Sequence, residues 1–423
     1  MATTYLTHTM STPTARTKST ISAWVKKTSE GANSTIFGGG DAATDCAFLN
    51  FNTSDKLFLQ SATSDSADWG ITTDAVFRDS SAWYHVVAKI DTTQSTSTDR
   101  VKIYVNGNLQ TVTGSYPSQN YDMQWSRNGE VQLVGKYPST GIYFNGLMAH
   151  VHFTDGYAYD ASTFGQTDST SGIWVPKTAP SVTYGTNGFF LKFENSAAMG
   201  TDSSGQSNTF TVNNSVTQNI DSPSNNFATG NPLNPDGTSV TTLINGNLTH
   251  NNNVSATGTF AVDKGKWYFE VKRQDNGGSI TNWMYCGYRP IDRYVGTSRL
   301  YRSSNGDYYN GSSYSSYGAS WGDGDIIGIA LDYDNDKIEF YKNGVSQGAK
   351  TSIGLCDGTL VTPQWQCSQS SGSPHLHANF GSGFFGTTAA ASANADGNGI
   401  GAFEYAVPSG YYALNTKNLK EFG

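Results

Sequence analysis

The sequence WGDGDIIGIALDYDNDKIEFYKNGV, which ends at Val345, constrains the fold more than any other stretch of this chain. Two runs of strand-forming residues, Ile326–Leu331 and Lys337–Lys342, flank a short acidic turn. The second run alternates apolar and polar residues, as a strand with one wet face does, whereas the first is apolar on both faces and predicts a strand covered on both sides. Asn343-Gly344 then supplies the pair of positive φ angles that a tight type I′ turn requires.

The same pattern occurs a second time, earlier in the chain. An apolar strand that ends in an acid, Trp83–Asp91, is followed by a polar loop and by an alternating strand, Val101–Asn108, that contains Asn106-Gly107. Because this strand–turn–strand unit occurs twice, we predict two β-sandwich domains of related design. Two copies are too few for a solenoid or a propeller.

Composition favours an all-β protein. The 423 residues include 46 glycines, 13% are aromatic and only 14% are charged, and no window shows sustained helical periodicity with caps. A formal net charge of −8 argues against a nucleic-acid partner, and no apolar run is long enough for membrane insertion. No cofactor is expected, and Met1–Met10 lacks the features of a secretion signal. The four cysteines are expected to be reduced, with a Cys356–Cys367 bridge as the alternative.

Residues 1–158 are predicted to form the first domain. Strands are expected over Ile21–Lys26, over the two sides of a hairpin within Ala47–Gln60, and over Leu147–Thr154. Through the motifs SAWVKK, WYHVVAKID, VKIYVNGNLQ and FNGLMAHVHFTDG, this region resembles the laminin-G/concanavalin-A-like family. The resemblance implies a jelly-roll β-sandwich.

Residues 159–238 are rich in turn residues and contain one expected strand, Gly188–Phe193. A loop of this length without its own core should lie on a neighbouring domain, so we expect Phe189, Leu191 and Phe193 to pack on the first sandwich. The segment resembles one found between a laminin-G-like and a following β-sandwich domain in structural proteins of marine bacteriophages. That resemblance implies a protein of the virion, made in the host cytoplasm.

Residues 239–423 are predicted to form the last domain. GKWYFEVK, which begins at Gly265, is followed in order by DGDIIGIALD, IEFYKNG, an NFG element and P-x-G-Y-x-x-L. This series resembles the SPRY family, whose members have a bent concanavalin-like sandwich. The expected fold class is therefore all-β: two tandem antiparallel β-sandwiches, laminin-G-like then SPRY-like, with an irregular docked connector.

The sequence argues against an enzyme. Glycoside hydrolysis, an activity found among concanavalin-like sandwiches, needs two carboxylates about 5–9.5 Å apart. None of the seven glutamates is followed by another acid within four residues. No nucleophile elbow, P-loop or zinc-protease motif occurs, so no catalytic residue is assigned.

No metal site is expected. His150 and His152, and likewise His375 and His377, are spaced to share one face of a strand, a geometry that can hold a metal, but we favour ordinary hydrogen-bonded histidines. The acids of segment 323–336 flank turns and lack the spacing of an EF-hand loop, so we interpret them as turn-formers rather than calcium ligands.

The candidate binding surface lies in the tyrosine-rich segment 294–321, where Ser, Gly and Asn separate the aromatic residues as in an adaptable paratope. Aromatic faces stack on sugar C–H groups and polar side chains bind hydroxyls, so the segment is predicted to bind a glycan or a protein partner. The alternative is that these tyrosines pack on one another, on the first domain or on a neighbouring subunit. Trp283 is expected in the core. The candidate residues are Tyr301, Asp307, Tyr308, Tyr309, Tyr314, Tyr317 and Trp321.

The favoured hypothesis is a non-enzymatic phage virion protein that recognises a glycan or another receptor on the host surface, as a tail fibre, tail tip or other adhesin. The alternative is a virion decoration or assembly protein that binds other virion proteins, and a glycan-degrading enzyme is an outlier. The chain has neither heptads nor a β-helical repeat for a fibre stalk, so attachment is expected through a globular face or another chain. A homo-oligomer is expected.

Overall fold

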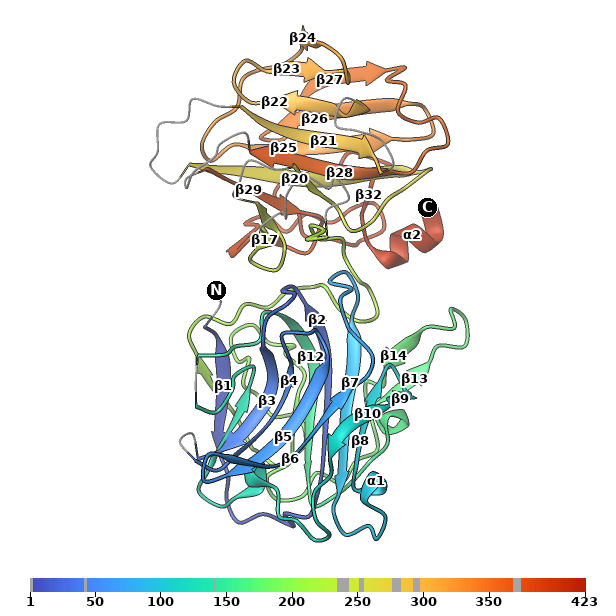
Figure 1. Ribbon diagram of the computed structural model, residues 1–423. Helices are drawn as coiled ribbons and strands as arrows, with labels where there is room; N and C mark the ends of the chain where they lie inside the picture. Colours follow the sequence, from blue (N-terminus) through green and yellow to red (C-terminus); the bar gives the residue numbers. More distant parts are fainter. Residues whose placement is uncertain are drawn as a thin grey trace. The chain divides into compact units, whose positions relative to one another are not determined.

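The computed structural model describes residues 3–41, 44–139, 141–233, 243–250, 255–275, 283–291, 297–367 and 374–423. The chain divides into two compact units, Met1–Gln218 and Asn219–Gly423. Each unit is built mainly from two antiparallel β-sheets (Figure 1). Among the described residues, no helix has the length and apolar character needed to cross a membrane.

The first unit contains an eight-stranded and a six-stranded sheet among its described residues. The strands of the larger sheet are β1 (Tyr5–Thr9), β3 (Ser34–Gly40), β4 (Cys46–Phe51), β5 (Leu57–Thr63), β6 (Ser66–Thr73), β10 (Val112–Ser115), β11 (Val131–Val134) and β16 (Thr211–Asn213). Those of the smaller sheet are β2 (Lys18–Lys27), β7 (Tyr84–Asp91), β8 (Val101–Val105), β9 (Asn108–Leu109), β12 (Gly146–Asp155) and β15 (Phe189–Leu191). The remaining elements are the hairpin β13 (Gly165–Thr167) and β14 (Trp174–Pro176), the helix α1 (Ser97–Arg100) and the 3₁₀ turns η1 (Gln124–Ser126) and η2 (Ala161–Thr163).

The core of the first unit lies between these two sheets. Val25 on β2 and Phe37 on β3 are fully buried members of one apolar cluster, because alternate residues of each strand point inward. The outer face of β2 is covered as well: Trp24 stacks on His85 at 4.7 Å between ring centroids, and Trp174 of the β13–β14 hairpin donates its indole N–H to His85 at 2.9 Å. Both faces of β2 are therefore buried.

The segment after residue 158 completes both sheets of the first unit. Its strand β15 pairs with β12, and β16 pairs with β1, so each becomes an edge strand. Phe189 and Leu191 are fully buried in the core, and Phe193 packs against it. The predicted domain boundaries at residues 158 and 238 stay predictions, while the compact units meet between residues 218 and 219.

The second unit also has two large sheets. The strands of the first sheet are β17 (Leu243–Ile244), β18 (Thr249–His250), β20 (Lys266–Asp275), β25 (Ile326–Asp332), β26 (Lys337–Lys342), β27 (Val345–Thr351), β29 (Pro374–Asn379) and β32 (Tyr412–Ala413). Those of the second are β19 (Ser255–Thr257), β21 (Met284–Pro290), β22 (Arg299–Arg302), β23 (Asp307–Tyr309), β24 (Tyr314–Ser316) and β28 (Val361–Cys367). A small hairpin, β30 (Phe384–Phe385) and β31 (Thr388–Ala389), and the C-terminal helix α2 (Thr416–Phe422) complete the unit.

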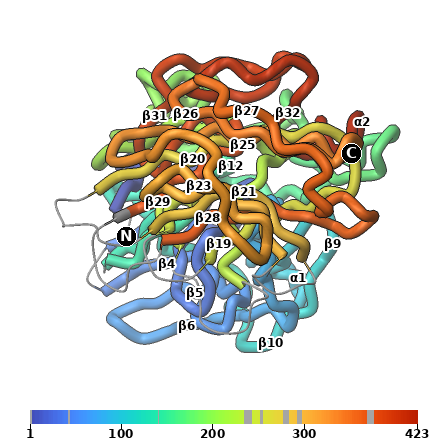
Figure 2. The backbone as a smooth tube through the Cα atoms, turned by 90° about the horizontal axis from the view of Figure 1, so that it is seen from above, coloured from blue at the N-terminus to red at the C-terminus, as the bar shows by residue number. Residues whose placement is uncertain are grey.

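The repeated hairpin pattern has the same place in both units. In the second unit β20, β25, β26 and β27 are consecutive neighbours (Figure 1), and Figure 2 shows them grouped together when seen from above. Asn343 at φ 48° and Gly344 at φ 78° lie in the last turn. In the first unit β2, β7, β8 and β9 follow the same order, with Asn106 at φ 49° and Gly107 at φ 81°. The sequence pattern thus marks one end of a sheet in each sandwich.

The central strand β25 is covered on both faces, as its apolar sequence predicts. Ile327 and Ile329 belong to the main core of the second unit, whereas Ala330 points the other way and packs with Tyr268 and Phe403. The cover on this second face comes from the C-terminal part of the chain, which brings Phe403 onto the sheet. All four cysteines are free thiols in the structure, and Cys46, Cys286 and Cys367 are buried.

Candidate functional site

The candidate site lies on the outer face of the six-stranded sheet of the second unit, at its β22–β24 end (Figure 1). The register pairs Tyr285 with Arg302, and Tyr309 with Tyr314. Residues that pair across an antiparallel sheet share a face, and neighbours along a strand alternate between faces. This alternation divides the tyrosine-rich segment into an inward and an outward set.

The outward set forms what we call the outer aromatic surface, and its centre is Arg302. The guanidinium carbon lies 3.7 Å from the centre of the Trp283 ring and 4.9 Å from that of Tyr314. Such cation–π contacts stabilise by about 0.5–2 kcal/mol each. The surface comprises Trp283, Tyr285, Arg302, Asp307, Tyr309 and Tyr314.

Hydrogen bonds and ring contacts fix the rest of this surface. The Tyr285 and Tyr314 hydroxyls are 3.0 Å apart and share a hydrogen bond, and the rings of Tyr309 and Tyr314 are 4.9 Å apart. Burial and the hydrogen bond with Tyr314 raise the pKa of Tyr285, so its hydroxyl stays protonated. Asp307 accepts a hydrogen bond from the Asn305 amide at 2.6 Å.

The inward set contains three of the seven predicted site residues. Tyr301, Tyr308 and Trp321 are at most 5% exposed and belong to the core of the second unit. The Tyr301 ring packs 5.3 Å from that of Phe340, and its hydroxyl donates to the carbonyl of Ala319. For these three residues the structure shows the packing that the sequence left open as an alternative to ligand contact.

The other four predicted residues have different positions. Asp307, Tyr309 and Tyr314 belong to the outer aromatic surface, and Tyr314 is 45% exposed. Tyr317 is half-buried, packs against the core and donates its hydroxyl to the carbonyl of Gly348. A ligand-binding role for these residues stays a prediction.

The expectation that Trp283 lies in the core is wrong. Its side chain is 45% exposed and rests on Arg302. The alternation of WMYCGY contains the signal: Met284 and Cys286 are buried in the core, so Trp283 and Tyr285 must point outward. Arg302 was not predicted as a site residue, because nothing in the sequence shows that it lies opposite Tyr285.

The structure places one histidine of each pair in a hydrogen-bonded position. A register shift between Ala149 and His152 interrupts β12, and His150 lies within it at φ 48°, so the even spacing of the first pair is broken. His152 is hydrogen-bonded to the Tyr184 hydroxyl at 2.9 Å. His377 is bonded to Thr249 at 2.8 Å and to Gln274 at 3.0 Å. Among the described residues, no group of three or more His, Cys, Asp or Glu side chains has the arrangement of a metal site.

The acids between residues 323 and 336 hold turns in place. Asp332 pairs with Lys266 at 3.0 Å, and Asp336 accepts backbone N–H bonds from the loop at residues 354–356. Burial raises the pKa of Asp336, but these N–H bonds outweigh it, and the net shift is downward. These contacts agree with the interpretation of these acids as turn-formers.

Among the described residues of the second unit, Glu270 is the carboxyl group whose pKa is raised furthest. It is fully buried on β20, and burial raises its pKa to about 7 although two backbone N–H groups, of Glu404 and Tyr405, donate to it at 2.9 Å. A carboxyl group without solvent access has no path to a substrate. Its hydrogen bonds instead fasten residues 404–405 to the outer face of the sheet.

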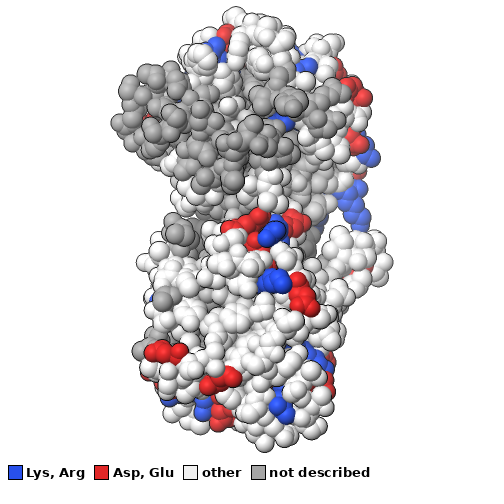
Figure 3. All heavy atoms as spheres, viewed as in Figure 1, with Lys and Arg blue, Asp and Glu red and all other residues white. Residues whose placement is uncertain are grey.

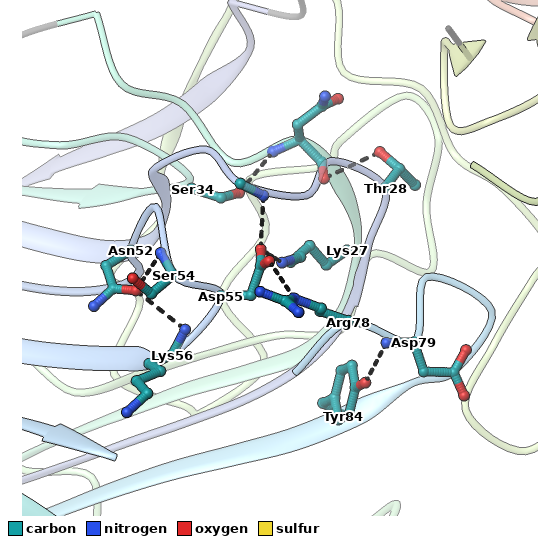
Figure 4. Close-up of polar contacts among 12 residues, drawn as sticks. Lys27, Thr28, Ser34, Asn52, Ser54, Asp55, Lys56, Arg78, Asp79 and Tyr84 are labelled. Atoms are coloured by element: carbon teal, nitrogen blue, oxygen red, sulfur yellow. Dashed lines mark hydrogen bonds and ion pairs between the residues drawn. The ribbon is translucent and has the colours of Figure 1, made fainter. Parts of the chain in front are cut away.

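The first unit has a buried ion pair at one end of its sandwich (Figure 4). Lys27 donates to Asp55, and both side chains are at most 2% exposed. Gly31 and Arg78 also donate to this carboxylate, at 2.9 and 3.1 Å. Burial alone would raise the pKa of Asp55, but these partners outweigh it and lower the pKa. The carboxylate is saturated by internal donors, so we assign it to structure rather than to ligand binding.

Charged side chains are sparse on one face of the first unit. In the view of Figure 3 its acidic and basic side chains form small, mixed groups on a largely uncharged face. This face agrees with the low charged fraction of the chain, 14%, and shows no large basic patch.

Two regions of the chain match known families. Residues 1–162 match the laminin-G type of the Concanavalin A-like lectin/glucanases superfamily, and residues 266–358 match the SPRY domain. The chain is therefore an all-β protein with a concanavalin-like domain and a SPRY domain in tandem, as its motifs predict. Both are β-sandwiches, and the first belongs to a superfamily that includes lectins and glucanases.

Individual proteins match over shorter regions. E3 ubiquitin-protein ligase RKP of Arabidopsis thaliana is 34% identical over 99 residues, which are 22% of this chain and only 8% of that protein. The SPRY domain of human HERC1 is 20% identical with a TM-score of 0.27, covering 31% of this chain and 85% of that one. The CBM40 of Ruminococcus gnavus IT-sialidase, bound to α2,3-sialyllactose, is 18% identical with a TM-score of 0.25, covering 31% and 70%.

Proposed function

We propose that this chain is a non-enzymatic recognition protein of a bacteriophage particle, which binds a glycan on the host surface through the outer aromatic surface. The observation that carries the proposal is the gathering of Tyr309, Tyr314 and Asp307 on one face of β23 and of the edge strand β24. Tyr314 is 45% exposed at the very edge of the sheet.

The chemistry of this surface suits a sugar. Tyrosine offers a flat apolar face at a low entropy cost together with a hydroxyl that can donate or accept a hydrogen bond. The side chain of Asp307 is 18% exposed, and its carboxylate is an acceptor for sugar hydroxyls beside those rings. Tyr309 and Tyr314 lie on paired strands and not on a free loop, so their rings are pre-ordered for a ligand.

The biological context rests on two supports. The domain order, with a concanavalin-like domain before a SPRY domain, is that of a chain built from binding-type folds. The sequence of residues 159–238 resembles segments of marine phage structural proteins. We therefore assign the chain to the virion surface, as a tail-tip, tail-fibre or other adhesin in a homo-oligomer.

The test is competition for phage adsorption. Excess purified chain, in its native oligomeric state, is added to host cells before the phage, and adsorbed particles are counted. Wild-type protein should reduce adsorption, whereas a Tyr309→Ala/Tyr314→Ala variant should not. Equal inhibition by both would move the binding site away from the outer aromatic surface.

The same experiment separates the adhesin from the alternative role in virion decoration or assembly. A folded wild-type chain that leaves adsorption unchanged would argue against host recognition. Binding of that chain to tail-less or chain-deficient particles would then support the decoration role, with the exposed rings as contacts to other virion proteins.

A further inference from the structure

We propose that Trp283 is the principal contact for an uncharged sugar ring, and that Arg302 is the positioning residue that holds the indole in place. The proposal deepens the glycan-binding function proposed above and rests on it. It names a ligand class, neutral pyranoses, and two residues outside the tyrosine-rich strands β23 and β24.

The first step is the geometry of the stack. Arg302 lies between two rings, with its guanidinium carbon 3.7 Å from the Trp283 ring centre and 4.9 Å from that of Tyr314. The guanidinium thus occupies one face of the indole. Trp283 is nevertheless 45% exposed, which leaves indole surface open to solvent.

The second step is the role of Arg302. Two rings pack against its guanidinium, its side chain is 12% exposed, and its Nε is buried without a hydrogen-bond partner among the described residues. A guanidinium so enclosed presents little to a ligand. Arg302 instead fixes the plane of the Trp283 ring. Strand pairing does not order Trp283, because β21 begins at Met284.

The third step is charge. Asp307 lies 3.8 Å from the Arg302 guanidinium and opposes its charge, so the pair is close to neutral overall. An acidic sugar would meet the Asp307 carboxylate and would lack a free cation in compensation. An uncharged pyranose can stack its C–H face on the indole and donate hydroxyls to the carboxylate. The surface therefore favours neutral sugars over carboxylated or sulfated ones.

The experiment measures binding of the full chain to a glycan array that carries neutral oligosaccharides and the sialylated or sulfated forms of the same oligosaccharides. Five proteins are compared: wild type, Trp283→Ala, Trp283→Phe, Arg302→Lys and Tyr309→Ala. Val345→Ala is the matched control, because Val345 is 65% exposed on β27, a strand of the other sheet.

Wild type should bind neutral members and lose affinity when the same sugar carries an acid. Trp283→Ala should weaken binding about tenfold or more, as for a buried aromatic contact, and Trp283→Phe should restore part of it. Arg302→Lys should weaken binding about three- to tenfold, and it should change acrylamide quenching of the exposed tryptophan, because a lysine keeps the charge but loses the planar stack. Val345→Ala should bind as wild type does.

The possible failures are distinguishable. If Tyr309→Ala abolishes binding but Trp283→Ala has no effect, or if only acidic glycans bind, the inference about Trp283 is overturned while glycan recognition stands. If Arg302→Lys leaves both binding and quenching unchanged, the positioning role is overturned. If the folded wild type binds no member of the array, both the proposed function and this inference fall.

Discussion

At the scale of single residues, the pair of Lys27 and Asp55 tests how much one buried charge contributes to the free energy of unfolding of the first unit (Figure 4). Asp55→Asn should lower the free energy of unfolding by about 3–5 kcal/mol, because it leaves the Lys27 ammonium buried without its counter-charge. Equilibrium unfolding of the full chain in urea measures the change.

An exposed pair provides the control for this prediction. Asp122 is 55% exposed and lies 3.5 Å from Arg16. Asp122→Asn should change the free energy of unfolding by less than about 1 kcal/mol, since solvent screens such pairs. If the two variants destabilise the first unit equally, the burial of the Lys27–Asp55 pair has no energetic consequence.

His85 makes the first unit sensitive to acid. The Trp174 indole can only donate, so Nδ1 of His85 must accept and the ring must be neutral. Burial, and then the charge of His150, lowers the pKa of His85 to about 3. The pKa of His85 is lower in the folded than in the unfolded state. The neutral ring therefore contributes its full stability above pH 6.5, and this contribution is lost as the pH falls toward 3.

We expect the free energy of unfolding to fall by on the order of 2 kcal/mol between pH 7 and pH 5 through this residue alone. His85→Gln should be less stable at pH 7 and should flatten the dependence on pH over that range. Carboxylates such as Asp55, whose pKa is lowered from 3.8, act only at lower pH. A first unit as stable at pH 5 as at pH 7 would refute the assignment; the raised pKa of Glu270 acts in the opposite direction, but that residue lies in the second unit.

At the scale of elements, the Asn-Gly turns set the register of the end hairpins. Gly344 has φ 78°, and an added Cβ would lie 2.7 Å from Cδ1 of Tyr405. Gly344→Ala should therefore destabilise the second unit by about 1–2 kcal/mol, the cost of a left-handed conformation, with a further cost if the Tyr405 ring does not move. Hydrogen exchange of the β26 and β27 amides, compared with wild type, would locate the effect.

Gly322 is the matched control for this turn. It lacks a positive φ, and an added Cβ would meet no atom within 4 Å. Gly322→Ala should change stability by about 0.5 kcal/mol or less. Equal effects of the two substitutions would mean that Gly344 is retained for a reason other than its conformation.

Local patterns in the sequence predicted the elements well. Alternation and Asn-Gly pairs act over neighbouring residues, so the strands at β7–β8 and β25–β26 and their turns followed directly from them. The apolar run at Ile326–Leu331 also predicted that β25 is covered on both faces.

The candidate site was predicted only in part, because it depends on pairing between short strands. The sequence placed Tyr308 and Tyr309 in one surface, but adjacent residues of β23 face opposite sides of the sheet, and only Tyr309 points outward. The Trp283–Arg302 contact joins two strands whose register no local pattern fixes. Likewise, nothing local shows that the β13–β14 hairpin covers the outer face of β2.

At the scale of the whole molecule, the described apolar cores show where the chain can be divided. The first core includes Phe189, Leu191 and Phe210, which lie beyond residue 158 and are at most 3% exposed. Each such side chain stabilises by about 3–5 kcal/mol, and a domain has only about 5–15 kcal/mol in total. We expect a fragment of residues 1–218 to fold and a fragment of residues 1–158 to remain unfolded, as near-UV circular dichroism and urea unfolding would show.

The second unit also depends on residues that precede its predicted boundary at residue 239. Phe227 and Ala228 are at most 1% exposed, and the N–H of Ala228 donates to the carbonyl of Leu414 at 2.9 Å, so residues before 239 hold the C-terminal part of this unit. Residues 219–423 should fold, whereas residues 239–423 should be destabilised or aggregate through the uncovered face of β20. If residues 1–158 and 239–423 both fold cooperatively, the sequence-based boundaries are right, and the segment between them is a dispensable cover rather than part of either core.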